Sequence, residues 1–149
     1  MKTRILFLCL AMACLTGCLE SVAVPIDGYS WEMTTIQGNE DGGVVACAPE
    51  LLQQNEGAQA LVLRCQAQDG VLTLTDATNK QGYSGTYRVE QAAPEATTYQ
   101  IAIGDAAGYA VTGMTTFLDG SQSPTFIINI GGYALNFHAV AQGEEAPSA

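Results

Sequence analysis

Residues 124–140 read Pro-Thr-Phe-Ile-Ile-Asn-Ile-Gly-Gly-Tyr-Ala-Leu-Asn-Phe-His-Ala-Val, and this stretch decides the fold class. Large apolar side chains occupy every second position on both sides of the glycine pair: Phe126, Ile128, Ile130, Tyr133, Leu135 and Phe137. A period of two residues is typical of a β-strand with one buried face. Gly131-Gly132 is a turn signal between two such runs. The stretch therefore predicts an antiparallel hairpin.

The same alternation extends upstream through most of the chain. Turn residues such as Asp69-Gly70 and Asp119-Gly120 separate about nine runs of strand formers. The predicted strands cover residues 29–37, 43–48, 60–67, 70–75, 83–91, 98–104, 109–118, 124–131 and 133–140. One short helix is expected at Pro49–Gln54, where a proline precedes good helix formers. Short connections favour antiparallel neighbours. We expect an all-β domain, a small antiparallel meander barrel, with a β-sandwich as the alternative.

Four segments are predicted along the 149 residues. Residues 1–17 form an export signal, with Lys2 and Arg4 before a short apolar run. That run is shorter than the roughly 20 residues that span a bilayer. Residues 18–26 are expected to be a lipidated tether and residues 27–141 a single β domain. Residues 142–149 have no apolar periodicity and are expected to form a disordered acidic tail.

The end of the signal carries a recognisable motif. Leu15-Thr16-Gly17-Cys18 resembles the lipobox of bacterial lipoproteins. The resemblance implies cleavage before Cys18, acylation of that cysteine and a membrane anchor. Leu19 follows, where an aspartate in Gram-negative lipoproteins signals retention at the inner membrane, so the resemblance implies a periplasm-facing position on the outer membrane. The alternative is a secretory signal with an incidental cysteine.

Two further cysteines remain in the expected mature chain, Cys47 and Cys65. An even pair in an oxidising compartment is typical of a disulfide. Their separation is neither that of a redox Cys-x-x-Cys motif nor that of a zinc knuckle. We therefore predict a structural Cys47–Cys65 disulfide and no metal site or cofactor.

The charge balance excludes one class of partner. Fifteen acidic residues stand against five basic ones, and two of those five lie in the expected signal. The expected mature chain thus has three basic and fifteen acidic residues, a net charge of −12. Nucleic acid and anionic membrane surfaces require clustered Lys and Arg. A basic protein partner in the envelope fits this charge, although an acidic surface also serves solubility alone.

Aromatic residues dominate the side chains expected to face inward: Tyr29, Trp31, Tyr83, Tyr87, Tyr99, Phe126, Tyr133 and Phe137. A barrel of about eight strands either fills its interior or holds one small ligand. Buried tyrosine hydroxyls need hydrogen-bond partners, which a ligand can supply. We predict a ligand pocket formed by these eight residues, and the alternative is a packed core with tyrosines near the mouths.

Short segments resemble three families of barrel proteins. Gly28-Tyr29-Ser30-Trp31 is similar to the Gly-x-Trp of lipocalins, with one residue more and no arginine in the last strand. Residues 83–87 are similar to a strand of the avidins, without the other biotin-contacting residues. Residues 84–87 also resemble a segment of lipid-anchored lysozyme inhibitors, whose second segment is not found. These resemblances imply a barrel.

The sequence does not point to catalysis. His138 is the sole histidine, and it alternates with Phe137, so its side chain is expected to point outward. The turn aspartates have the ordinary task of stabilising turns. We expect a protein that is not an enzyme. The first hypothesis is a lipid-anchored envelope protein that binds a protein partner, as an inhibitor, assembly factor or accessory subunit. The alternative is a small-molecule carrier that uses the barrel interior.

Overall fold

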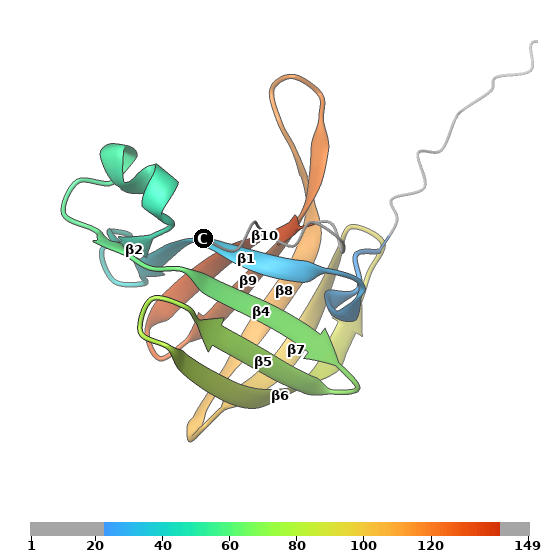
Figure 1. Ribbon diagram of the computed structural model, residues 1–149. Coiled ribbons are helices and arrows are strands. Elements are labelled where there is room, and N and C mark those ends of the chain that lie inside the picture. The colour runs from blue at the N-terminus through green and yellow to red at the C-terminus, as the bar shows by residue number, and fades with distance from the viewer. Residues whose placement is uncertain (1–22, 141–149) are drawn as a thin grey trace, which may run out of the picture.

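The computed structural model describes residues 23–140 (Figure 1). The predicted signal, Cys18 and the predicted acidic tail lie outside these residues. Ten strands and two short 3₁₀ helices are present: η1 (Ile26–Gly28), β1 (Ser30–Gly38), β2 (Val44–Cys47), η2 (Pro49–Gln54), β3 (Gln59–Ala60), β4 (Leu63–Gln68), β5 (Val71–Asp76), β6 (Gln81–Ala92), β7 (Ala96–Ile103), β8 (Ala106–Thr116), β9 (Gln122–Ile130) and β10 (Tyr133–Val140). In the described part of the chain, no helix is both long and apolar enough to cross a membrane.

Eight of the strands close into an antiparallel barrel. Strands β4 to β10 pair in chain order, and β1 completes the circle by pairing with β4 on one side and β10 on the other. The β9–β10 hairpin pairs Phe126 with Phe137 and Ile130 with Tyr133 around the Gly131-Gly132 turn, as the sequence predicts. The predicted all-β barrel is confirmed, and the structure is not a sandwich.

A β-bulge in β1 accompanies its pairing with three neighbouring strands, β10, β4 and β2. The register against β10 passes from Met33–Phe137 to Thr35–Asn136, so Thr34 has no partner in the ladder. Such a bulge bends a strand and reverses the faces of the residues after it. The first half of β1 pairs with β4, and the second half pairs with β2, outside the barrel wall. The excursion β2–η2–β3 follows (Figure 1). The helix predicted at Pro49–Gln54 is present there as a 3₁₀ helix.

Below the mouth, alternating side chains of the barrel strands fill the interior. Leu72 on β5 and Ile128 on β9 are completely buried, as are Trp31 and Phe126. Trp31 packs its ring 5.2 Å from that of Phe126, which in turn lies 5.4 Å from Phe137. Because period-two alternation places successive side chains on opposite faces, the strand pattern alone selects these core positions.

The N-terminal segment Val24–Gly28 closes one end of the barrel, which we call the plug end. Val24 and Ile26 are 4% and 2% exposed and belong to the core cluster. Trp31 donates from Nε1 to the Ile26 carbonyl at 2.8 Å, and Thr112 donates from Oγ1 to the Val24 carbonyl at 2.6 Å. The Ile26 amide donates to the Tyr99 hydroxyl at 3.2 Å. The sequence analysis assigned residues 24 and 26 to the tether, whereas the structure places them in the core.

Candidate functional site: the apolar mouth of the barrel

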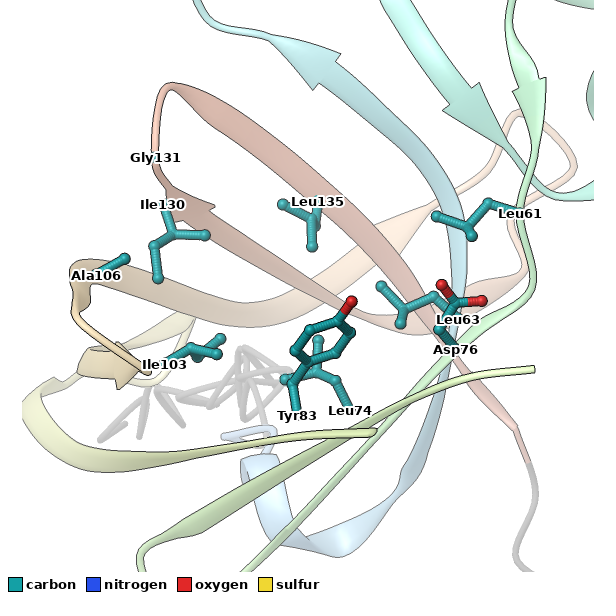
Figure 2. Close-up of a pocket in the computed structure, with 10 residues that line it drawn as sticks. All are labelled: Leu61, Leu63, Leu74, Asp76, Tyr83, Ile103, Ala106, Ile130, Gly131 and Leu135. Carbon is teal, nitrogen blue, oxygen red and sulfur yellow. The ribbon is translucent and has the colours of Figure 1, made fainter. Parts of the chain in front are cut away.

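A cavity of about 330 Å³ opens at the end of the barrel opposite the plug (Figure 2). We call this end the mouth. The lining residues come from seven of the eight barrel strands and the adjoining turns: Leu61, Leu63, Leu74, Asp76, Tyr83, Ile103, Ala106, Ile130, Gly131 and Leu135. Six of these are Leu or Ile. This volume falls within the range of small-molecule sites, which are concave and mostly apolar with a few polar groups.

Strand alternation places these side chains at the mouth. Leu74 on β5 lies opposite Tyr83 on β6, so both face inward. Likewise Leu135 on β10 lies opposite Ile128 on β9, and Ile130 is two residues nearer the β9–β10 turn on the same face. On each of these strands, the inward-facing residues nearest the mouth line the cavity, and the inward-facing residues farther from it fill the core. The plug closes one end of the barrel, and within residues 23–140 no corresponding segment fills the other end, where the cavity lies.

Two polar groups lie at the rim among the apolar side chains. The Tyr83 hydroxyl donates to Oε1 of Gln81 at 2.5 Å, and Tyr83 is 46% exposed. Asp76 accepts hydrogen bonds from Asn79, at 2.7 Å from the side-chain Nδ2 and 2.9 Å from the backbone amide. These hydrogen bonds hold the pKa of Asp76 below its ordinary value. The rim therefore presents a hydroxyl and an ionised carboxylate above an apolar floor.

Of the eight predicted pocket aromatics, Tyr83 alone lines this cavity. Trp31, Tyr99, Phe126 and Phe137 are buried in the filled part of the core, while Tyr29 and Tyr87 pack against that core. Tyr133 lines a separate cavity with Glu40 and Asp41. Within residues 23–140 the eight residues are thus spread over two cavities and the packed core, and most of them lie in or against that core.

The aliphatic residues of the cavity were missed by the sequence analysis. Leu63, Ile103 and Leu135 have the same alternation as the buried core residues, so their inward orientation was readable. Their position near the open end was not readable, because it depends on which end the plug occupies. The only sequence signal was that Ile103 and Leu135 lie near the turns at Gly104-Asp105 and Gly131-Gly132.

The predicted disulfide is absent, and Cys47 and Cys65 are both buried free thiols. Cys65 lies opposite Trp31 and faces the core, whereas Cys47 lies opposite Thr35, after the bulge, on the outer face of the wall. Their partners on β1 are separated by about 13 Å of strand, whereas a disulfide joins Cα atoms at most about 7 Å apart. The prediction is wrong because the bulge places the two side chains on opposite faces. Burial raises the pKa of Cys65 to about 12.

Acidic residues also gather near the mouth. Glu40 and Asp41 line the neighbouring cavity of about 390 Å³ beside Gly131 and Gly132. Within residues 23–140, no group of three or more His, Cys, Asp or Glu side chains is placed to hold a metal ion. The mouth therefore offers apolar surface bordered by negative charge.

Comparisons with protein-family models, with curated proteins and with solved structures found no match for this chain.

Proposed function

We propose that this protein is a lipid-anchored envelope protein that binds a small apolar ligand in the mouth of its barrel. The observation that carries the proposal is the cavity of about 330 Å³ lined by six Leu and Ile side chains. Without a ligand, the Leu and Ile side chains that line the cavity lack apolar partners on one side. Contacts with water replace these partners poorly. The function proposed is binding and not catalysis.

The rim narrows the chemical class of the ligand. Hydrogen bonds from Asn79 lower the pKa of Asp76 and so favour its charged form. An anionic head group at the rim would be repelled by this carboxylate. The proposed ligand is therefore a neutral or cationic amphiphile, with its apolar body against Leu74 and Leu135 and its polar group beside Tyr83.

The test uses the mature chain without acyl groups, so that no detergent competes for the cavity. The probe is N-phenyl-1-naphthylamine, which is uncharged and fluoresces in apolar surroundings. Ala106→Trp places a large ring in the cavity mouth without removing a core contact, since Ala106 is exposed. Its matched control is Ala107→Trp, on the opposite face of β8.

We expect saturable probe binding, weakened at least about tenfold by Ala106→Trp and unchanged by Ala107→Trp; tenfold corresponds to about 1.4 kcal/mol. Absence of saturable binding, or equal effects of both substitutions, would count against the ligand site.

The anchor in this proposal is an acylated Cys18 on the periplasmic face of the outer membrane. Its support is the lipobox resemblance of residues 15–18 and Leu19 after them. Cys18→Ala should leave uncleaved and unacylated precursor. Mass spectrometry of the native N-terminus tests this directly, and a free amine at a different residue would contradict it.

A basic protein partner is the second candidate. It is favoured by Glu40 and Asp41 near the mouth, on a chain of strongly acidic composition. Such an association should weaken as salt screens the charges. Glu40→Gln with Asp41→Asn should slow association while leaving probe binding in the cavity unchanged, which separates the two candidates.

A further inference from the structure

The tip of the β8–β9 hairpin carries two exposed apolar side chains, and one of them, Leu118, is the most exposed large hydrophobic residue of the described chain. Leu118 at its tip is fully exposed, and Phe117 beside it is 51% exposed. The hairpin projects beyond the body of the barrel (Figure 1). A turn of defined hydrogen bonds holds this tip: the Phe117 amide donates to the Ser121 carbonyl at 2.8 Å, and the Gly120 amide donates to the Phe117 carbonyl at 2.9 Å. The apolar pair is thus presented to solvent by an ordered turn.

The hairpin and the N-terminal segment leave the barrel at the same end. Strand β8 begins at the mouth with Ala106 and reaches the plug end at Thr112, which bonds the Val24 carbonyl. The six residues from Thr112 to Leu118 extend at most about 20 Å beyond that bond. The six residues from Val24 back to Cys18 also reach at most about 20 Å when extended. A membrane that holds acyl chains on Cys18 therefore lies within reach of the hairpin tip.

The composition of the hairpin fits a lipid surface. From residue 114 to residue 125 it contains one ionisable side chain, Asp119, although the chain as a whole is strongly acidic. Asp119 accepts hydrogen bonds from the hydroxyl and the amide of Ser121, at 2.6 Å and 2.9 Å. This carboxylate suits the polar layer of a zwitterionic bilayer, while the two apolar side chains reach the acyl boundary. Two side chains are too small for a stable protein interface, which buries about 800 Å² on each partner.

We propose that the Phe117-Leu118 tip of the β8–β9 hairpin inserts into the membrane as a second contact beside the lipid anchor. This inference rests on the proposed acylation of Cys18. It fixes the orientation of the barrel: the plug end faces the membrane, and the mouth with its cavity faces the aqueous compartment. A single lipid anchor would leave the barrel free to rotate, whereas two contacts at one end keep the mouth turned toward the aqueous compartment.

The experiment uses the mature acylated protein in phosphatidylcholine vesicles whose acyl chains are brominated, because bromine quenches tryptophan at short range. Leu118→Trp places a tryptophan at the tip, where the native side chain makes no core contact. Tyr133→Trp is the matched control, at an exposed position of the mouth end. The native Trp31 is completely buried in both variants and supplies a constant background.

We expect Leu118→Trp to lose most of its added emission in brominated vesicles and to keep it in unbrominated ones, while Tyr133→Trp keeps its emission in both. Loss of emission from both variants, or from Tyr133→Trp alone, would overturn the orientation. Unquenched Leu118→Trp emission on protein whose Cys18 is shown to be acylated would overturn the insertion and leave the anchor intact. If the emission of Leu118→Trp changes when envelope proteins are added but does not change with lipid, the tip binds a protein partner and the inference is overturned. Absence of acylation would remove both the anchor and the inference.

Discussion

The plug end is most sharply tested by replacing the Thr112 hydroxyl. Thr112 is completely buried and donates from Oγ1 to the Val24 carbonyl at 2.6 Å. Thr112→Val keeps the shape of the side chain and the strand preference of a β-branched residue, but it removes this donor. The Val24 carbonyl is then left buried without its partner. Such a loss costs about 1–3 kcal/mol.

Thermal unfolding of the mature chain measures this cost. For a domain of this size, 1 kcal/mol corresponds to roughly 4 °C, so the expected fall in Tm is about 4–12 °C. Thr115→Val is the matched control on the same strand, because Thr115 is exposed and its hydroxyl lies 3.3 Å from that of Thr125. The control should change stability by less than about 0.5 kcal/mol. Equal stability of Thr112→Val and the native protein would refute the closed plug, since water would then be replacing the lost donor.

Three further predictions concern the thiols and a close strand contact. Under non-reducing conditions Cys47 and Cys65 should both resist alkylation in the native protein and both react after unfolding, as mass spectrometry would show. If they failed to react after unfolding, the two cysteines would instead be joined by the disulfide that the sequence predicts. Burial raises the pKa of Cys65 from 9.0 to about 12, so the folded protein holds this proton more tightly than the unfolded chain does. The resulting stabilisation is fully present below pH 9 and is lost as the pH rises toward 12, by up to about 4 kcal/mol. In denaturant titrations, the free energy of unfolding should therefore fall more steeply with rising pH in the native protein than in Cys65→Ala. Gly85→Ala would press a methyl group against the Ala102 carbonyl and should cost about 1–3 kcal/mol in unfolding assays, whereas Gly82→Ala meets its nearest backbone atom at 3.9 Å and should cost less.

The contact at Gly85 also gives a physical reason for the glycine in residues 83–87, the segment that resembles avidins and lysozyme inhibitors. Gly85 lies opposite Ile103 on β7, and a side chain there would collide with the wall of the neighbouring strand. The barrel itself requires the glycine, independently of any ligand or enzyme partner. The resemblance therefore supports the barrel and not a particular function.

The sequence by itself determined the strands and their inward faces. Period-two alternation is a local property of the chain, so Phe126, Ile128 and Phe137 could be assigned to the core before any pairing was known. The turn residues, such as Gly131-Gly132, fixed where strands end and made antiparallel neighbours the natural choice. Closure into a barrel followed from many strands with one apolar face and little helix to cover a second one.

Only the tertiary structure decided the site and the state of the cysteines. The bulge at Thr34 arises from the register of β1 against β10, which lies about 100 residues away in sequence, and it places Cys47 and Cys65 on opposite faces. The position of the cavity depends on the end that Val24 and Ile26 fill, and these two residues lie outside the strands. Alternation specifies which side of a strand is buried, but the depth of a residue along the barrel axis depends on contacts between distant segments. That depth separates the filled core from the open mouth.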